Sequence, residues 1–245
     1  MEERNKTSKG FLMKKAVIGL SGGMDSSTLL GMLLEDNVKV HACHFQYGSK
    51  HNPYEKRAMD RVLEYYTSKK FPIEVHRFDV GSSIFKMFDS HLLLDGDEIP
   101  EGHFESSNMK QTVVPGRNTI FAAIMLGLAQ TVCADTIALG VHAGDHVIYP
   151  DCRASYIQSL HTTIQEASDG AVNISAPFLD MDKSDILTLG YGLTYPVPYH
   201  RTRTCYKPQL RACGRCGSCQ ERLEAFEKVG KVDPIVYKCK NKIKK

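Results

Sequence analysis

Two hydrophobic periods alternate along the chain, and together they predict strands that alternate with helices. The short apolar runs that predict strands are residues 15–20, 38–45, 73–79 and 136–140. The segments whose apolar spacing or composition predicts helices are residues 26–34, 55–68, 119–133, 153–167 and 183–189. This order is typical of an α/β protein with a doubly wound, mainly parallel sheet and helices on both faces.

Two segments depart from the simple alternation. Residues 119–133 are apolar nearly all round, so we expect a buried helix there. Residues 81–112 show no regular period and predict an irregular connection. In open parallel sheets, ligands bind beyond the carboxyl ends of the strands. The residues that follow Leu20, Phe45 and Leu139 are therefore expected to meet in one crevice.

The first predicted strand is followed by a glycine-rich loop, residues 21–27 (SGGMDSS), which also begins the first helix. Backbone N–H groups in such a loop, together with the helix N-terminus, form a site for anions such as pyrophosphate. Ser21, Ser26 and Ser27 add hydroxyl donors, and Asp25 is a candidate Mg²⁺ ligand. The alternative is an ordinary strand-to-helix turn in which Ser or Asp caps the helix.

Composition narrows the class of protein. With 245 residues, 42% of them hydrophobic, the chain can bury a core as one domain, and its net charge of +3 is nearly balanced. Residues 1–14 are a polar tail, and residues 238–245 are a basic tail that we expect to be solvated. No apolar stretch approaches the roughly 20 residues of a bilayer span, so we expect a cytoplasmic protein without membrane contact. The sequence indicates no large basic surface, so we do not expect direct nucleic-acid binding.

Four of the eight cysteines lie in one short segment with the spacing C-x7-C-x2-C-x2-C, at Cys205, Cys213, Cys216 and Cys219. Four thiolates at this spacing close a tetrahedral Zn²⁺ site without an open position, which is typical of a structural metal. An iron–sulfur cluster can use the same ligands and is the alternative. The surrounding residues 196–237 contain several prolines, so we expect a small zinc-binding segment without helix or sheet, which completes the active site or a dimer contact.

The glycine-rich loop resembles the SGG-x-DSS signature of the PP-loop ATP pyrophosphatases, and it lacks the GK[ST] ending of a Walker A loop. The resemblance implies that residues 15–195 form a PP-loop domain, which cleaves ATP between its α and β phosphates and passes AMP to a substrate. The residues that it assigns to ATP are Leu20, Ser21, Gly22, Gly23, Asp25, Ser26, Ser27 and Phe45.

Four further motifs occur in the order found in one subfamily: residues 45–51 (FQYGSKH), 114–118 (VPGRN), 140–153 (GVHAGDHVIYPDCR) and the cysteine block. Over about residues 15–226 the chain resembles the 7-cyano-7-deazaguanine synthase family of the queuosine pathway. The resemblance implies a C–N bond-forming ligase that uses ATP, Mg²⁺ and free ammonia and contains structural zinc. It adenylates 7-carboxy-7-deazaguanine, forms an amide, and dehydrates the amide to the nitrile after a second adenylation. Members are usually homodimers.

The resemblance assigns substrate binding to Arg117, Asn118, Tyr149, Asp151 and Arg153. The guanidinium of Arg117 can donate a fork of hydrogen bonds to a carboxylate or phosphate, whereas Asn118 either binds substrate or caps the apolar helix. Asp151 can pair with the amidine-like edge of a deazaguanine, and Tyr149 can stack on its face. A solvated turn is the alternative for this loop.

Three residues are assigned to catalysis, namely Asp25, Arg117 and Lys183. Lys183 either meets the ATP phosphates or faces solvent, and Asp145 is a second candidate for holding the metal. The chain departs from the family at Lys50, where the usual YGQRH stretch has arginine. Lysine supplies charge but no bidentate fork, which puts a fork contact at this position in doubt.

Three other functions compete with this interpretation. A related enzyme stops at the 7-amido product. A tRNA-modifying sulfurtransferase or lysidine-type ligase shares the phosphate loop but needs a reactive cysteine pair or a basic surface. A zinc-containing nucleic-acid binding module with an inactive ATP fold is the alternative outside the enzymes.

Overall fold

The computed structural model describes residues 14–81 and 84–238. The polar tail expected at residues 1–14 and the basic tail expected at 238–245 therefore lie almost wholly outside the described residues. The sheet is parallel, as the hydrophobic periods predict, and its strand order is β3-β2-β1-β4-β5. Its strands are β1 (Lys15–Gly19), β2 (Lys39–Gln46), β3 (Ile73–Asp79), β4 (Thr136–Ala138) and β5 (Asn173–Ser175).

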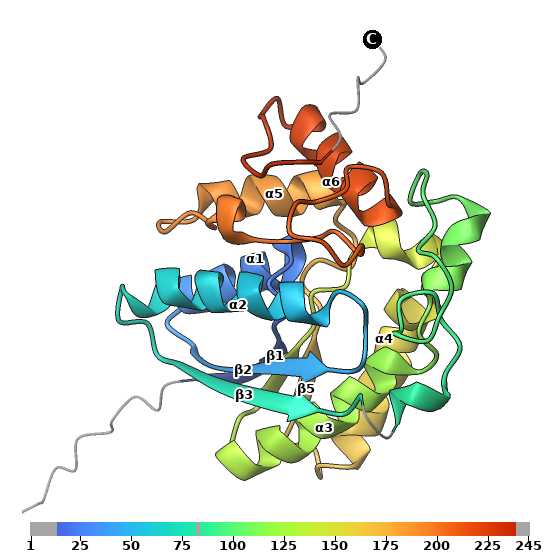
Figure 1. Cartoon of the computed structure of the whole chain (residues 1–245). Coiled ribbons are helices and arrows are strands. Elements are labelled where there is room, and N and C mark those ends of the chain that lie inside the picture. Colours follow the sequence, from blue (N-terminus) through green and yellow to red (C-terminus); the bar gives the residue numbers. More distant parts are fainter. Residues whose placement is uncertain (1–13, 82–83, 239–245) are drawn as a thin grey trace, which may run out of the picture.

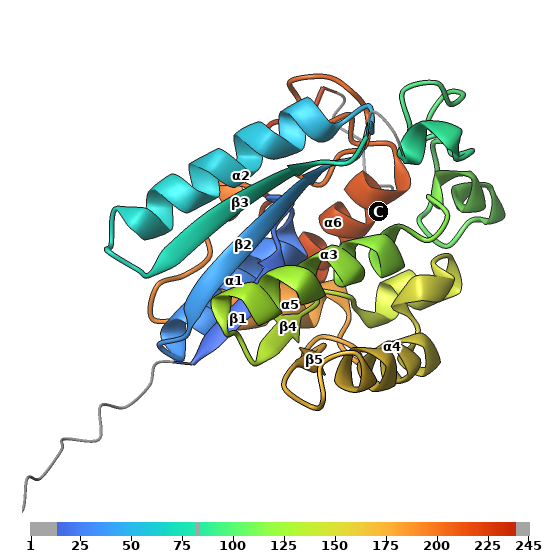
Figure 2. The same ribbon diagram turned by 90° about the horizontal axis from the view of Figure 1, so that it is seen from below.

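Helices cover both faces of the sheet (Figure 1, Figure 2). On one face lie α1 (Met24–Glu35), α2 (Asn52–Thr67) and α5 (Lys183–Gly192), and on the other lie α3 (Arg117–Val132) and α4 (Ala154–Glu166). Five short 3₁₀ helices connect these elements: η1 (Phe85–Met87), η2 (Ser107–Thr112), η3 (Ala143–Val147), η4 (Pro150–Cys152) and η5 (Tyr199–Arg201). The doubly wound architecture that the sequence predicts is confirmed.

Two hydrophobic cores follow from the alternation of side chains along the strands. In β1, Val17 belongs to the core under α3 and α4, whereas its neighbour Ile18 belongs to the core under α1 and α2. Both side chains are fully buried, because a strand with helices on both faces has no solvent-facing side. The sheet is thereby fixed in position, and the carboxyl ends of its strands form one shared edge.

The prediction that residues 119–133 form a buried helix is wrong in one respect. The helix forms, but only Ala122, Met125 and Ala129 of α3 are buried. The segment Ser107–Val132 is long and apolar enough to cross a membrane by length and composition, and 28% of its 18-residue apolar window is buried. However, η2 and α3 are separated by extended backbone at Val113, and the 16 residues of α3 are fewer than the roughly 20 of a bilayer span. We therefore interpret α3 as a surface helix packed on the sheet.

The cysteine segment also differs from the prediction, because it contains a helix, α6 (Gly217–Lys228), which begins between the last two cysteines. The prolines of the segment lie before or after this helix and do not interrupt it. On the inner face of α6, the buried Arg222 donates two hydrogen bonds to Asp233, at 2.7 and 2.9 Å, and further bonds to Thr202 and to the Tyr199 carbonyl. These bonds connect the chain before and after the cysteines.

The Arg222–Asp233 pair predicts a large stability effect. Replacing Arg222 by Met leaves the carboxylate of Asp233, which is 3% exposed, without its charge partner, and we expect a loss of roughly 3–5 kcal/mol in urea unfolding. The double variant Arg222→Met/Asp233→Asn should recover part of this loss. The exposed pair Arg201–Glu64 is the control, and Glu64→Gln should cost at most about 1 kcal/mol. Equal losses for the two pairs would contradict the interpretation.

Candidate active site

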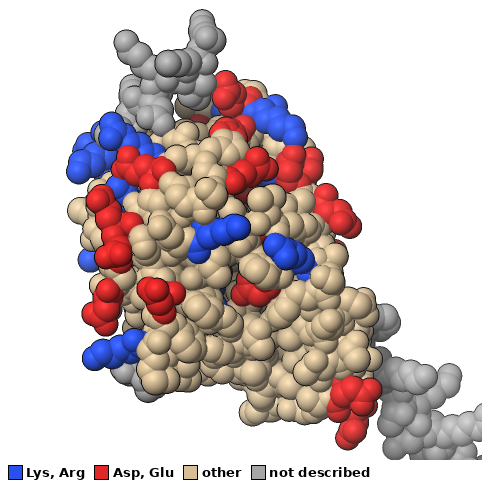
Figure 3. Space-filling view, turned by 90° about the vertical axis from the view of Figure 1, so that its right-hand side faces the viewer, with Lys and Arg blue, Asp and Glu red and all other residues tan. Residues whose placement is uncertain are grey.

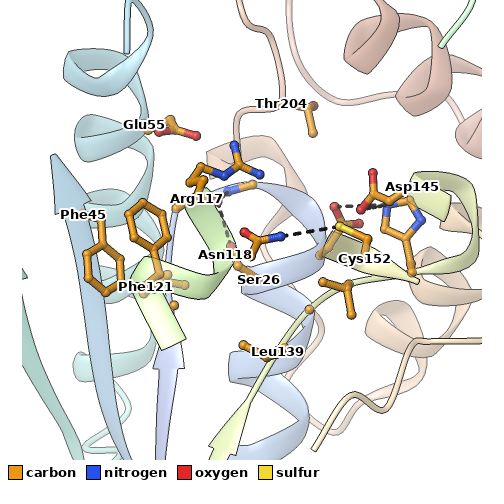
Figure 4. A pocket seen from close by; sticks show the side chains of 18 of the residues that line it. Ser26, Phe45, Glu55, Arg117, Asn118, Phe121, Leu139, Asp145, Cys152 and Thr204 are labelled. Carbon is orange, nitrogen blue, oxygen red and sulfur yellow. Dashed lines mark hydrogen bonds and ion pairs between the residues drawn. The ribbon is translucent and has the colours of Figure 1, made fainter. Parts of the chain in front are cut away.

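A cavity of about 270 Å³ opens at the carboxyl edge of the sheet. Leu20, Phe45 and Leu139 all line it, which confirms the predicted meeting of the three strand ends. In Figure 4, Phe45 and Phe121 stand on one side of the cavity and Asp145 on the other, with Asn118 between them. The cavity therefore has an aromatic side and an acidic side. Residues of the loop that follows β1 line the same cavity.

The phosphate loop has the geometry of an anion site. Gly22 adopts φ +81°, and a Cβ there would overlap the backbone nitrogen of Met59, so only glycine lets the loop lie on α2. The Ser21 hydroxyl accepts a bond from the Gly23 N–H at 3.1 Å and lies 3.1 Å from the Ser26 hydroxyl. These hydroxyl groups are held at the mouth of the loop, beside the N-terminus of α1.

Two buried oxygens in the same loop, Asp25 Oδ1 and Ser27 Oγ, have no hydrogen-bond partner among the described residues. Buried polar groups without partners are rare, because each one costs free energy that the fold must offset. A ligand with donor groups or a divalent cation would satisfy Asp25 Oδ1. The donor set thus fits a nucleotide with its metal ion, as the sequence predicts.

A buried ionic cluster joins the loop to α5 and α6. Lys183 lies 2.5 Å from Glu221 and 3.5 Å from Asp25, and His142 lies within 3.8 Å of Asp25, Asp145 and Glu221. Desolvation alone would lower the pKa of Lys183, but these carboxylates outweigh it and hold the pKa above its usual range. Lys183 is 6% exposed, so the solvent-facing alternative is wrong. The ammonium group remains charged inside the cavity wall.

The substrate residues expected from the sequence are only partly brought together. Arg117, Asn118 and Tyr149 line the cavity. Asp151 lies behind them, where its carboxylate accepts a hydrogen bond from the backbone of Asn118 at 3.3 Å. Arg153 is exposed and donates to the His146 carbonyl. Substrate roles for Asp151 and Arg153 stay predictions that the geometry does not favour.

The alternative that Asn118 caps the helix is wrong, because α3 begins one residue earlier, at Arg117, and Gly116 is the cap residue. The side chain of Asn118 instead donates to the Asp151 carbonyl at 3.4 Å and approaches Cys152 Sγ at 3.5 Å. These bonds fix the loop that carries Tyr149 against the first turn of α3.

Two cavity residues, one in α2 and one in the turn before it, carry only weak sequence signals. His51 and Glu55 both line the cavity, with side chains 3% and 18% exposed. Burial raises the pKa of Glu55 to about 7, and burial with the nearby cations of Arg117 and Arg203 lowers the pKa of His51 to about 3. Figure 4 places Glu55 next to Arg117. A carboxyl group that titrates near neutral pH can exchange protons with a ligand.

Other lining residues were missed because they come from the cysteine segment, far along the chain. They are Arg203, Thr204, Tyr206, Ser218 and Glu221. Only the general expectation that this segment completes the site pointed to them. Lys50, where the family has arginine, does not line the cavity and donates to the carbonyls of His91, Gly96 and Asp97. It anchors a loop beside the site, and no bidentate contact is needed there.

The four cysteines of the predicted metal site converge. All four are buried, and their Sγ atoms lie within 4.8 Å of one another. Backbone N–H groups of Arg215 and Cys216 point at Cys213 Sγ, each at 3.3 Å, as donors do toward thiolates. The cluster is thus able to hold a metal ion, and it lies at the N-terminus of α6, the helix that carries Glu221 into the cavity.

Comparison with known proteins agrees with this geometry. The family model described as queuosine biosynthesis protein QueC matches residues 15–230. The chain is 39% identical over 227 residues to the 7-cyano-7-deazaguanine synthase of Pseudoalteromonas atlantica, covering 92% of this chain and 100% of that one. It is 42% identical over 221 residues to the synthase of Marinobacter nauticus, covering 90% and 96%. The NMN synthetase structure from Francisella tularensis shares the fold, with a TM-score of 0.50 and 15% identity over 91% of this chain and 79% of that one.

The raised pKa of Glu55 predicts a pH-dependent stability. Its carboxyl has a pKa of about 7 in the fold against an ordinary value of 4.5, so this group favours folding below pH 4.5 and its contribution is lost as pH rises through 7. Glu55→Gln should therefore be more stable than wild type at pH 8, by roughly 3 kcal/mol at most. The difference should shrink towards pH 5. Thermal unfolding at both pH values measures it, with the exposed Glu166→Gln as control. A constant difference would contradict the assignment.

Proposed function

Because the chain belongs to the queuosine biosynthesis protein QueC family, we propose that it converts 7-carboxy-7-deazaguanine and ammonia to 7-cyano-7-deazaguanine with ATP. The main observation that supports this proposal is that residues of the phosphate loop, Lys183 and Arg117 line one cavity. ATP would be cleaved to AMP and pyrophosphate in two successive adenylations, first of the carboxylate and then of the amide. The enzyme is thus a C–N bond-forming ligase, and we place it in the cytoplasm.

The phosphate loop supports ATP binding at the β1 end of the cavity. Ser21, Ser26 and the N–H groups at the start of α1 would hold phosphate oxygens, and Gly22 permits the tight turn. The unpartnered Asp25 Oδ1 supports a Mg²⁺ site at the same place. Bound Mg²⁺ would neutralise negative charge on the pyrophosphate that leaves. Lys183 adds a permanent positive charge within 3.5 Å of Asp25.

The other side of the cavity suits the planar substrate. Phe45 and Phe121 stack with their ring centroids 4.0 Å apart and present an apolar wall, and the guanidinium of Arg117 lies over the Tyr47 ring. Arg117 is held in a buried setting where a carboxylate would be a strong partner. We assign to it the orientation of the substrate carboxylate towards the phosphate loop. Asn118 and Tyr149 would contact the ring system.

A smaller cavity of about 20 Å³ adjoins the first and supports the use of free ammonia. It is lined by Asp145, Tyr149, Tyr206, Ser218 and Glu221, which also line the larger cavity. This volume is enough for one water-sized molecule, since about 10–15 Å³ suffices. The two carboxylates would attract an ammonium ion, and we propose that ammonia reaches the acyl adenylate from this side.

The proposed reaction releases protons that the buried carboxyl groups could accept. Ammonia loses one proton when the C–N bond forms and AMP leaves, and the amide nitrogen loses two more on the way to the nitrile. Burial raises the pKa values of Glu55 and Glu221, which makes both groups better proton acceptors than ordinary carboxylates. We assign the proton transfers to these two residues.

The competing enzyme reaction, sulfur transfer, is disfavoured by the cysteines that line the cavity. Only Cys43 and Cys152 do so among the described residues. Burial raises the pKa of Cys43 to about 12 and raises that of Cys152 well above its usual range, so neither is a thiolate at neutral pH. A binding module without activity would not need the unpartnered Asp25 oxygen or the buried Lys183. These observations favour the synthase.

We propose that the four-cysteine cluster binds structural zinc. The Sγ atoms of Cys213 and Cys219 are 3.8 Å apart, which equals the separation of about 3.8 Å that two ligands have around tetrahedral Zn²⁺ with Zn–S bonds of about 2.3 Å. A four-iron cluster would hold the sulfurs farther apart, because each would bind a different iron. With no open position, zinc would fix α6 and Glu221 and would take no part in the reaction.

The surface of α3 supports a homodimer. Its exposed positions include Thr119, Ala123, Gly127 and Thr131, which repeat every four residues and therefore lie on one face. A Cβ at Gly127 would meet nothing within 4 Å. Figure 3 shows that the side carrying α4 is poor in charge over its lower part. We propose that a second copy covers α3, and that no membrane or nucleic acid takes its place.

The dimer proposal predicts a size change. Ala123→Glu places a charge on the exposed face of α3 and should shift the protein from dimer to monomer in analytical ultracentrifugation, with unchanged thermal stability of the monomer core. Thr188→Glu, an exposed position of α5 on the other side of the sheet, is the matched control and should remain dimeric. A wild type that sediments as a monomer would rule the proposal out.

Activity is tested by mass spectrometry of the products formed from 7-carboxy-7-deazaguanine, ammonium, ATP and Mg²⁺. We expect the nitrile and AMP from wild type, and at least about a 100-fold slower formation of both by Asp25→Ala, because a metal ligand in the phosphate loop is lost. Asp36→Ala, at the far end of α1, is the control and should be fully active. An amide as the final product would identify the enzyme that stops one step earlier. Absence of AMP would refute catalysis and favour the binding module.

A further inference from the structure

A second group of metal-ligating side chains lies outside the active site, on the two outer strands of the sheet. His41 belongs to β2, and Glu74 and His76 belong to the edge strand β3. The parallel register pairs His41 with Glu74, and His76 follows two residues later, so all three side chains point to the same face. The proposed reaction uses none of them, and none lines the cavity.

The donor atoms of the three residues are as close together as ligands of one ion. His41 Nδ1 lies 3.2 Å from His76 Nε2 and 3.5 Å from a carboxylate oxygen of Glu74, and all three donors are within 4.8 Å of one another. Ligands at bond lengths of about 2.1 Å around tetrahedral zinc are separated by about 3.4 Å. The two separations measured from His41 Nδ1 are on either side of this value. Two imidazoles and one carboxylate are also a donor set that zinc and neighbouring transition metals prefer.

We propose that His41, Glu74 and His76 bind one divalent transition-metal ion, Zn²⁺ or a chemically similar ion, which clamps the edge strand β3 to β2. Three protein ligands leave one position open, and water fills it. Glu74 is 50% exposed, so the ion has access from solvent, whereas His41 is buried at 2% exposure and anchors the ion to the sheet. The site is separate from the four-cysteine cluster.

The ion pair beside His41 leaves one carboxylate oxygen of Glu74 available to an ion. Lys39 forms an ion pair with one oxygen of Glu74 at 2.5 Å, and the other oxygen is the one that faces His41. The carboxylate can therefore keep its lysine and bind the ion.

A metal here would act on the weakest part of the sheet. An edge strand has a neighbouring strand on one side only, and every residue of β3 is either half-buried or exposed. Because its ligands come from both strands, the ion would link the edge strand β3 to β2, which is almost wholly buried. Because binding to the folded state alone adds stability, the ion should delay unfolding of this edge.

The test is the zinc content of the full-length protein after equilibrium dialysis against micromolar Zn²⁺, measured by plasma mass spectrometry. Wild type should hold two zinc ions per chain, one in each site, and His76→Ala and Glu74→Gln should each hold one. Affinity at the strand site should fall at least about 100-fold in either variant. His200→Ala, which removes an exposed histidine of η5, is the matched control and should still hold two.

Two further readouts separate the sites. Co²⁺ added to protein with one zinc in the cysteine cluster should give weak visible bands of a nitrogen and oxygen site, without the intense sulfur-to-cobalt band. Zinc at about 100 times its Kd should raise the Tm of wild type by about 5 °C relative to Glu74→Gln. One zinc in wild type, or equal second-site binding in wild type and both variants, would overturn the proposal. None of these readouts depends on the synthase reaction.

Discussion

One buried ammonium group holds the active site together. Lys183, at the first position of α5, lies between Asp25 of the phosphate loop and Glu221 of α6. Without it, carboxylates from three separate segments would repel one another at low dielectric, and the loop and α6 would not share a wall. The capping box of Asp182 and Asp185 fixes the helix end that presents the lysine. The local structure of α5 therefore decides whether the two halves of the cavity meet.

The cysteine segment follows from the same constraint. Glu221 must reach Lys183 from a helix that begins among the cysteines, and α6 is short, so its position depends on what holds its first turn. The converging thiols hold one end of this segment, and the buried pair of Arg222 with Asp233 holds the other. The cysteine cluster thus helps to determine the geometry of a side chain inside the cavity. This explains why the cluster lies next to the cavity.

The sequence predicted the fold well because hydrophobic periods are local properties. β1 to β4, α1 to α5 and the crevice at their carboxyl ends all follow from short patterns, and the phosphate loop from a motif of seven residues. The prediction failed where burial depends on what packs against an element. Apolar composition cannot tell a buried helix from α3, whose small exposed residues leave a surface open. Proline content likewise could not exclude α6, because none of the prolines lies within it.

Within the site, motif residues were easier to predict than the residues that complete it. Asp25, Arg117 and Lys183 stand in recognisable strings, whereas Glu55 and Glu221 have an ordinary sequence context and reach the cavity only through the fold. Asp151 illustrates the opposite case, since it stands in the family string but binds the backbone of α3.

The charge arrangement of the cavity also suits the two successive adenylations that we propose. Lys183 is fixed near the phosphate loop and Arg117 near the aromatic wall, so positive charge is present at both ends, and neither cation has to move when a carboxylate is replaced by a neutral amide. What must change between the steps is the number of protons. Glu55, whose pKa burial raises to about 7, can take up or release a proton near neutral pH, whereas a carboxyl group with an ordinary pKa would stay ionised there. In the proposed reaction the fixed cations would hold negative charge and the titrating carboxyl would exchange protons. Burial raises the pKa of Glu55, whereas the neighbouring carboxylates keep Lys183 charged.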